Sequence, residues 1–591
     1  MRLLALLGAG CALAAGPAAG APTAPLGQSG RWITDAKGRV VILHGVNMVY
    51  KRPPYHPLAA GFDAPDARFL AREGLGAVRL GVIYAGVEPR PGNYDDRYLD
   101  RIRRTLRTLA REGVFSQLDF HQDMYNERFQ GEGFPDWAVQ DDGLPAEPKL
   151  GFPGNYIGMP ALNRAFDHFW ANDPGPGGIG LQDRYAAAWG HVARRFRNEP
   201  YNMGYDLFNE PWPGTGWQAC ANNVGCPVFD EQRLTPMSRR AYRQIRRSDK
   251  RNIVWYEPNV IYNNGPQTHH GDIGPRAGMS FHIYCLQEGG TPTPSPMDEQ
   301  QARSCEPFET LPFQNADMQS ARTGDALILS EFGATDDLGQ IERLERYADR
   351  QMVSWLYWHY CECADPTTSG AGGTQSVVGD ARKAPTGANV KRAKLAVLTR
   401  PYPQAVAGVP QRWSFDPETK RFELAYSTRR KGGGSFAFRA DTQVFVSPRH
   451  YPRGYDVRVK GAEALSEPGS RRLRIRTCTG RKRVELTVTR GSGRFRADCR
   501  APRTPPSRIR LRVRPRRVLA GTLTRFRFRA TVRRGRRLRG ALIRFAGRRV
   551  RTNRGGRAYL RVRLRRRGRR RAVVSKRGYR RGRATVRVLR R

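Results

Sequence analysis

The sequence predicts an α/β protein built on a (β/α)8 TIM barrel, followed by a β-sandwich and by a second, smaller, arginine-rich β-sandwich. Three observations support this expectation. From residue 31 to about residue 400, short apolar runs alternate with longer amphipathic stretches. Beyond residue 401 short alternating strands follow one another between turn residues, and beyond residue 506 apolar residues alternate with arginine. A chain of 591 residues also exceeds one ordinary domain.

We therefore divide the chain into five segments. Residues 1–20 are expected to form a signal peptide and residues 21–400 the barrel. Residues 401–501 are expected to form the first sandwich, residues 502–506 a linker, and residues 507–591 the arginine-rich domain.

The N-terminal segment has the parts of a secretory signal. Arg2 supplies a positive charge, and the apolar run over residues 3–15 is too short to span a bilayer. Small residues around Ala19 fit a cleavage site, which predicts a mature chain beginning near Ala21. The sequence thus predicts a secreted, extracellular protein, with retention at the cell envelope as an alternative.

Eight cysteines follow this segment, an even number that favours disulfides in a secreted protein. We expect Cys220 to pair with Cys226 and Cys478 with Cys499, because each pair lies close together and apart from the others. The pairing of the remaining four stays open: Cys285, Cys305, Cys361 and Cys363. No cysteine and histidine spacing typical of a metal site occurs.

The barrel prediction rests on eight apolar runs with helical stretches between them. The runs span residues 40–43, 77–80, 114–118, 203–207, 253–256, 279–281, 326–329 and 355–358. The helical stretches span residues 66–72, 95–111, 185–197, 236–247 and 341–347. The alternative, a doubly wound sheet, requires a glycine-rich phosphate turn after the first strand. The segment 44–47 reads His-Gly-Val-Asn instead, which favours the barrel.

The two β domains follow from alternation with a period of two. Strands of the first sandwich are expected at residues 422–426, 435–438, 443–446 and 483–488. In the last segment Ile509, Leu511 and Val513 alternate with arginine, as do Phe526 and Phe528. This alternation predicts a folded sandwich and resembles bacterial immunoglobulin-like modules.

Charge is concentrated in that last segment. Residues 503–591 carry 37 of the 102 Lys and Arg residues and no acidic residue. We expect this domain to bind an anionic cell-envelope or membrane surface, with no specific nucleic-acid partner. A folded spacer whose arginines have no binding role is the alternative.

Catalytic groups in such a barrel lie at the carboxyl ends of the strands. Glu210 follows the fourth run within Asn209-Glu210-Pro211, and Glu331 follows the seventh. Glu257 follows the fifth run. Two carboxylates across a barrel mouth can flank one glycosidic bond, one protonating the leaving oxygen while the other attacks the anomeric carbon.

These residues carry a resemblance to glycoside hydrolase family 5. Asn209-Glu210-Pro211, Glu331-Phe332-Gly333 and Trp358 lie after the strands that the family uses. The longer strings around His121, Glu210 and Pro401 resemble endoglycoceramidases, which release intact oligosaccharide from ceramide. The match covers residues ~30 to ~500.

The resemblance implies a retaining glycosidase that acts on a glycolipid. This chemistry needs no cofactor or metal, and we expect a monomer. Glu210 would be the general acid/base and Glu331 the nucleophile. The resemblance implies substrate-binding roles for Arg79, Asn209, His282, Tyr284 and Trp358. Lys51, His121 and Asp123 are polar groups at strand ends suited to sugar hydroxyls, and Trp170 is also expected to bind substrate. The alternatives are a supporting pair for His121 and Asp123 and a solvated loop residue for Lys51.

A long segment after the third strand bears on the substrate. Residues 121–181 are far longer than a usual barrel loop and rich in bulky apolar side chains. They include Trp137, Phe152, Ile157 and Phe169, which the resemblance implies wall a channel for alkyl chains. The alternative for this segment is a self-packed lid. For the function of the protein the alternatives are a β-glucanase, a monohexosylceramide glycosidase, and a non-catalytic envelope protein that binds glycans.

Overall fold

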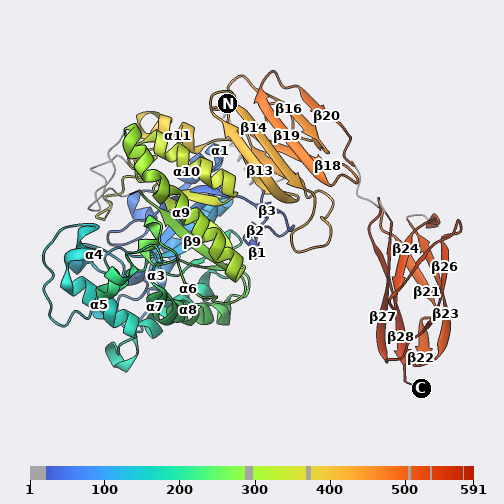
Figure 1. Ribbon diagram of the computed structural model, residues 1–591, viewed down its shortest axis with the longest axis horizontal. Coiled ribbons are helices and arrows are strands. Elements are labelled where there is room, and N and C mark those ends of the chain that lie inside the picture. The colour runs from blue at the N-terminus through green and yellow to red at the C-terminus, as the bar shows by residue number, and fades with distance from the viewer. Residues whose placement is uncertain are drawn as a thin grey trace, which may run out of the picture. The chain divides into compact units, whose positions relative to one another are not determined.

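A computed structural model describes residues 21–285, 297–367, 375–502, 507–532, 535–576 and 578–590 (Figure 1). The predicted signal peptide and residues 503–506 of the predicted linker lie outside these ranges. The chain forms two compact units, Met1–Arg476 with Arg483–Asp498, and Thr477–Lys482 with Cys499–Arg591. Among the described residues no helix combines the length and apolarity needed to cross a bilayer.

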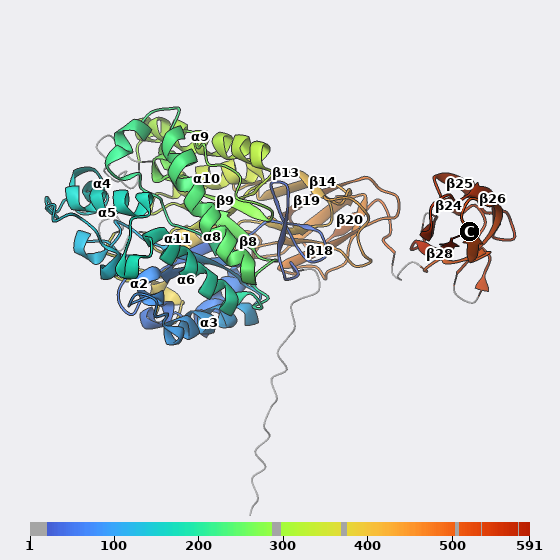
Figure 2. The same cartoon turned by 90° about the horizontal axis from the view of Figure 1, so that it is seen from below.

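A closed barrel of eight parallel strands forms the centre of the first unit, which confirms the predicted fold (Figures 1 and 2). Its strands are β4 (His44–Met48), β5 (Ala77–Ile83), β6 (Phe115–His121), β7 (Asn202–Asp206), β8 (Ile253–Tyr256), β9 (Ala277–Ile283), β10 (Ala326–Phe332) and β11 (Ser354–Tyr357). The barrel closes where β11 pairs with β4.

All five predicted helical stretches are helical. The helices of the barrel region are α1 (Ala64–Glu73), α2 (Tyr84–Val87), α3 (Asp96–Arg111), α4 (Gly154–Gly158), α5 (Pro160–Ala171), α6 (Leu181–Phe196), α7 (Pro227–Phe229), α8 (Thr235–Ser248), α9 (Glu299–Thr323), α10 (Leu338–Gln351) and α11 (Arg392–Leu398). In α3 the Asp95 side chain accepts hydrogen bonds from the first free N–H groups, as an N-cap does. Helix α9 was not predicted, because Pro307 and Pro312 lie inside it and proline normally ends a helix.

Short 3-10 or π turns connect these elements. They are η1 (Pro57–Ala60), η2 (Glu127–Phe129), η3 (Asp136–Ala138), η4 (Pro176–Gly178), η5 (Gly214–Cys220), η6 (Asp230–Leu234), η7 (Val260–Asn264) and η8 (Gly387–Asn389).

The run over residues 40–43 was predicted as the first barrel strand, but it is not part of the barrel. Val40–Val41 is β3 in a seven-stranded sheet of order β1-β2-β3-β12-β15-β18-β17, and the barrel begins one element later with β4. Successive side chains point to opposite faces, so Val40 and Ile42 enter the sandwich core while Val41 and Leu43 pack under the barrel. The continuous apolar run reflects contact with two cores.

The first sandwich therefore extends beyond residues 401–501. Its seven-stranded sheet contains β1 (Gly27–Ser29), β2 (Trp32–Thr34), β3, β12 (Tyr402–Val406), β15 (Thr442–Phe445), β17 (Ala462–Ala464) and β18 (Arg472–Thr477). The second sheet contains β13 (Val409–Asp416), β14 (Arg421–Ser427), β16 (Tyr455–Lys460), β19 (Arg483–Arg490) and β20 (Phe495–Ala497). The predicted strand at 435–438 is absent from the described fold: it follows three glycines with left-handed φ, Gly432, Gly433 and Gly434.

The arginine-rich domain is folded, as predicted. One sheet consists of β21 (Arg510–Arg514), β23 (Leu523–Thr531) and β26 (Arg557–Arg563). The other consists of β22 (Arg517–Leu519), β24 (Leu542–Phe545), β25 (Arg548–Arg551), β27 (Gly568–Ser575) and β28 (Gly582–Leu589). Phe526, Phe528 and Phe545 lie in its buried core, while the arginines of β21 remain exposed.

The described residues form four disulfides. Cys220–Cys226 and Cys478–Cys499 pair as predicted. The four cysteines whose pairing was open form Cys285–Cys305 and Cys361–Cys363.

Candidate active site

A cavity of about 890 Å³ lies at the carboxyl ends of the barrel strands, and both predicted catalytic carboxylates line it. Glu331 lies near the end of β10 and Glu210 follows β7. One carboxylate oxygen of each glutamate and a ring nitrogen of His282 all lie within 4.8 Å of one another. The two acids are therefore close enough to act on the same bond.

Four side-chain or backbone contacts hold Glu210. Asn263 donates from Nδ2 to Glu210 Oε1 at 2.7 Å, and His282 Nδ1 lies 2.8 Å from the same oxygen. The backbone N–H of Glu210 donates to Glu257 Oε2 at 2.8 Å, while Gln122 Nε2 reaches the Glu210 carbonyl at 3.2 Å. Asn263 and Glu257 were absent from the predicted site residues. Only the position of Glu257 at a strand end signalled it in the sequence.

Glu331 is held by two residues that the sequence placed here. Arg79 donates from Nη1 to Oε1 at 2.5 Å, and the Tyr284 hydroxyl donates to Oε2 at 2.9 Å. Burial raises the pKa of Glu331 above its usual value, although His282 and Arg79 pull it down. The cations thus limit the rise but do not cancel it.

Arg79 is fully buried and lies beneath the carboxylates, so it does not line the cavity as a substrate-binding residue would. Its guanidinium pairs with four carboxylates: Asp119 at 3.0 Å, Asp206 at 2.9 Å, Glu257 at 2.6 Å and Glu331 at 2.5 Å. It therefore organises the floor of the site.

Asn209 does line the cavity. Its Oδ1 accepts from Arg79 Nη2 at 2.9 Å, and its Nδ2 donates to the Gln122 carbonyl at 2.9 Å. An amide nitrogen carries two hydrogens, so one remains for a substrate hydroxyl.

Lys51, His121 and Asp123 form a polar part of the cavity together with Trp358. Lys51 Nζ lies 2.5 Å from Asp123 Oδ2 and 4.6 Å from the centre of the Trp358 ring. Thr367, which the sequence did not single out, accepts from Lys51 at 2.6 Å. These groups offer donors, acceptors and a flat face, as sugar binding requires.

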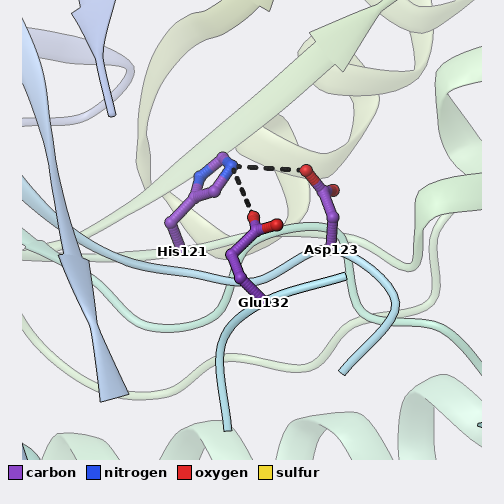
Figure 3. A group of neighbouring side chains, drawn as sticks. All are labelled: His121, Asp123 and Glu132. Atoms are coloured by element: carbon purple, nitrogen blue, oxygen red, sulfur yellow. Dashed lines mark ion pairs between the residues drawn. The ribbon is translucent and has the colours of Figure 1, made fainter. Parts of the chain in front are cut away.

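His121 and Asp123 point toward Glu132, which does not line the cavity (Figure 3). His121 Nε2 lies 3.6 Å from Asp123 Oδ2 and 4.0 Å from Glu132 Oε1. Burial lowers the pKa of His121, but Asp119 and Asp123 outweigh it and raise that pKa to about 10. Although the three donors could surround a cation, Lys51 Nζ already lies 2.5 Å from Asp123 and 3.9 Å from Glu132, so the cluster is built around ion pairs within the chain.

The structure corrects one predicted substrate contact. Trp170, on α5, does not line the cavity. Its indole N–H donates to the Trp212 carbonyl at 2.7 Å, and its ring packs against Phe208. Trp212 and Trp217 line the cavity instead. Aromatic composition alone cannot show which ring of a buried helix reaches a cavity.

His282 is likewise buried behind the two glutamates and does not line the cavity. Its Nδ1 lies 2.8 Å from Glu210 and 3.6 Å from Glu331, and its Nε2 lies 3.5 Å from Glu257. It can therefore position and charge-balance the acids without touching substrate.

The apolar part of the cavity comes from several segments. The residues are Phe152, Pro153, Tyr156, Ile157, Trp212, Trp217, Ala221, Val260, Ile261, Phe308 and Ala334. The first four come from the long segment after β6, as predicted for part of that segment. Trp137 and Phe169, also expected there, do not line it: Trp137 donates to the Glu88 carbonyl at 2.9 Å, and Phe169 is fully buried in the core.

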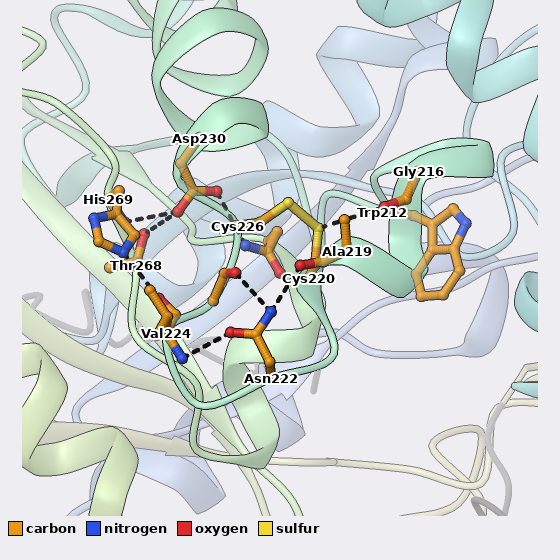
Figure 4. Close-up of a disulfide and its surroundings, with 12 residues drawn as sticks. Trp212, Gly216, Ala219, Cys220, Asn222, Val224, Cys226, Asp230, Thr268 and His269 are labelled. Atoms are coloured by element: carbon orange, nitrogen blue, oxygen red, sulfur yellow. Dashed lines mark hydrogen bonds between the residues drawn. A yellow bond between two sulfur atoms is a disulfide. The ribbon is translucent and has the colours of Figure 1, made fainter.

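A disulfide reinforces the chain beside Ala221. Cys220–Cys226 closes a short loop in which Asn222 Nδ2 donates to the Ala219 carbonyl at 2.7 Å (Figure 4). Nearby, Asp230 accepts from the His269 N–H at 2.7 Å. These bonds fix the wall of the cavity on this side.

Residues 34–363 match the cellulase family, glycosyl hydrolase family 5, and residues 400–489 match the glycoside hydrolase family 5 C-terminal domain. The chain is 33% identical to endoglycoceramidase I of Rhodococcus hoagii over 464 residues, which cover 76% of this chain and 85% of that protein.

Two solved structures of endo-glycoceramidase II from Rhodococcus sp. are similar. Its ganglioside GM3 complex has a TM-score of 0.64 at 28% identity and covers 78% of this chain and 99% of that one. Its lactosyl-enzyme intermediate has a TM-score of 0.62 at 28% identity and covers 77% of this chain and 99% of that one.

Proposed function

This chain belongs to glycoside hydrolase family 5, and we propose that it hydrolyses the bond between the oligosaccharide and the ceramide of glycosphingolipids with retention of configuration. The observation that carries the proposal is one cavity with two chemical parts. Lys51, Asp123 and Trp358 suit sugar hydroxyls and ring faces, while an apolar wall suits alkyl chains. Glu210 and Glu331 line the same cavity.

In the first step Glu331 attacks the anomeric carbon, and the bond from that carbon to the ceramide oxygen breaks. Glu210 gives its proton to the departing oxygen, so ceramide leaves as an alcohol. The carboxylate oxygens lie within 4.8 Å, which suits a covalent route better than one that places a water between them. The lactosyl-enzyme intermediate of the similar structure supports the covalent route.

In the second step Glu210 takes a proton from water, and the water oxygen attacks the anomeric carbon. The bond to Glu331 breaks, and the carboxylate departs with its charge shared by Arg79 and Tyr284. Asn209 is placed to donate its second amide hydrogen to the sugar 2-hydroxyl, a contact that strengthens toward the transition state.

Product analysis tests the substrate. The protein is incubated separately with a sialylated glycosphingolipid, glucosylceramide and cello-oligosaccharides, and products are identified by mass spectrometry. Release of intact oligosaccharide together with ceramide supports the proposal. Cleavage of cello-oligosaccharides or glucosylceramide without release of intact oligosaccharide from the larger lipid contradicts it.

The arginine-rich domain is proposed to hold the enzyme at an anionic membrane or envelope surface. Arg512, Arg529 and Arg557 lie in register across β21, β23 and β26, and all three side chains are exposed. Like charges directly opposite one another on a sheet destabilise it. An anionic surface removes this repulsion and gains long-range attraction.

We further propose that the protein works outside the cell. The predicted signal peptide over residues 1–20 and the four disulfides support export, because disulfides persist in oxidising compartments. The glycolipid-rich outer surface of a cell is then an accessible source of substrate.

A further inference from the structure

The segment that follows β8 contacts Glu210 at two positions and the neighbouring Pro211 at a third. Glu257 Oε2 accepts the backbone N–H of Glu210 at 2.8 Å, and the Val260 N–H donates to the Pro211 carbonyl at 3.0 Å. Asn263 Nδ2 donates to Glu210 Oε1 at 2.7 Å. We call Glu257, Val260 and Asn263 the β8 clamp.

Glu210 needs such support because its backbone is strained. Its φ is 46°, in the left-handed region that a side chain with a Cβ rarely adopts. Strained residues persist only where surrounding contacts hold them, and they gather at functional sites. Without the clamp the peptide could relax, and the carboxyl group would turn away from the bond it must protonate.

Glu257 also joins the two halves of the catalytic pair. Its Oε1 accepts from Arg79 Nη2 at 2.6 Å, and that guanidinium contacts Glu331. His282 Nε2 lies 3.5 Å from Glu257 Oε1, while its Nδ1 contacts Glu210. Burial raises the pKa of Glu257, but His282 and Arg79 outweigh it and lower that pKa, so the carboxylate is an acceptor at neutral pH.

The clamp is itself anchored. Asn259, between Glu257 and Val260, donates from Nδ2 to the buried Asp230 at 3.0 Å. Asp230 also accepts from the His269 N–H and from Thr268 Oγ1, at 2.7 and 3.0 Å (Figure 4). Farther along, Asn315 Nδ2 donates to the Gly265 carbonyl at 2.7 Å. The clamp therefore presents its three contacts from a fixed backbone.

We propose that Glu257 and Asn263 are positioning residues for general acid/base catalysis, acting through Glu210 without touching the reacting bond. The inference rests on the proposed function only in taking Glu210 as the acid/base. It adds that the end of the fifth barrel strand sets the orientation of this acid.

Leaving-group dependence separates this role from a structural one. A substrate with a poor leaving group needs the proton from Glu210, whereas 2,4-dinitrophenolate departs without it. Glu257→Gln keeps the volume but removes the charge that fixes Arg79 and His282. It is expected to lower kcat/KM about 100-fold for phenyl β-lactoside and less than about 5-fold for the dinitrophenyl β-lactoside.

A second test of the positioning role is whether azide rescues the second step, in which the glycosyl-enzyme is hydrolysed. With dinitrophenyl lactoside the variant should accumulate glycosyl-enzyme, because a misplaced Glu210 activates water poorly. Azide needs no base, so it should raise kcat and yield glycosyl azide. Glu345→Gln is the matched control, since Glu345 is buried on α10 outside the cavity. In this control variant kcat/KM for both lactosides should stay within about twofold of the value for the unmodified protein.

Asn263→Ala provides an independent test if Glu257→Gln does not fold, as judged by circular dichroism. This variant should also lose more activity on the phenyl lactoside than on the dinitrophenyl lactoside, with kcat/KM for the phenyl lactoside about 10-fold lower. Equal losses on the two lactosides, or no response to azide, would overturn the inference. Failure to cleave glycosphingolipid would count against the proposed substrate alone, because soluble lactosides report on Glu210 whatever the natural aglycone.

Discussion

Arg79 Nη1 lies 2.5 Å from Glu331 Oε1, and the other nitrogens of the same guanidinium contact Asp119, Asp206 and Glu257. A single buried cation thus contacts four carboxylates, and His121 and His282 share in balancing their charge. The planar fork of arginine can make these contacts at once, whereas an ammonium group cannot.

Arg79→Lys is therefore expected to lower kcat/KM about 100-fold or more while keeping the positive charge. Weaker pairing raises the pKa of Glu331 further, because the cation that pulled it down is less well placed. The acid limb of the pH profile should then move to higher pH. A pH series of kcat/KM on a soluble glycoside checks this, and an unchanged profile would show that Arg79 does not control the ionisation of Glu331.

The apolar wall should matter for lipid substrates only. Ile157 lines the cavity and is 56% exposed, so Ile157→Ala removes wall surface with little effect on the core. It and Trp217→Ala are expected to lower kcat/KM about 10-fold on a glycosphingolipid and less than about twofold on an aryl glycoside. Trp137→Ala is the control, since that ring lies off the cavity. Similar losses on both substrates in the Ile157 variant would indicate a structural lid.

Stability should depend on pH through two carboxyls of α10. Burial raises the pKa of Glu345 from 4.5 to about 8 and that of Asp349 from 3.8 to about 6, although Arg400 pulls both down. Because the folded-state pKa exceeds the unfolded one, their contribution to the free energy of unfolding is fully present below about pH 4. It is lost as pH rises toward about 8.

Glu345→Gln removes most of this titration. The melting temperature of the unmodified protein should fall relative to that of the variant between pH 5 and pH 9, by a few degrees. Scanning calorimetry at three pH values measures the difference. A difference that stays constant, or that changes in the opposite direction, would contradict the assignment.

The surface-binding role of the arginine-rich domain can be tested by truncation. A chain ending at Pro505 should keep its activity on soluble glycosides, because the described residues that line the cavity lie between Lys51 and Thr367. Its binding to phosphatidylserine-containing vesicles at low salt should fall sharply, and ~0.5 M salt should have the same effect on the full chain by screening. Replacing Arg512, Arg529 and Arg557 by Gln in the full chain should lower binding by less than truncation does, because most of the domain's basic residues remain. Equal binding by all forms would exclude the role.

Much of the fold could be predicted from the sequence because its signals are local. Seven of the eight barrel runs lie within or overlap barrel strands, whose residues are buried on both faces. The run over residues 40–43 was wrongly predicted as a barrel strand because its alternate residues pack into the sandwich core and under the barrel. Helix α9 was missed because Pro307 and Pro312 obscure it.

The site was predictable where a residue type and a strand end coincide, as for Glu210, Glu331 and Tyr284. Asn263 lies on a turn after β8, and no periodicity marks which amide on a turn will face a carboxylate. The prediction that Trp170 contacts substrate was wrong. An aromatic residue in a long apolar segment can pack inward or line a cavity, and only the tertiary structure decides between the two.

The division of roles between the two glutamates is the central claim, and a covalent trap tests it most directly. A 2-deoxy-2-fluoro glycoside with a dinitrophenyl leaving group forms the glycosyl-enzyme quickly but hydrolyses slowly. Peptide mapping by mass spectrometry then identifies the labelled residue. The label is predicted on Glu331, with one sugar per chain. A label on Glu210 would reverse the assignment of nucleophile and acid/base.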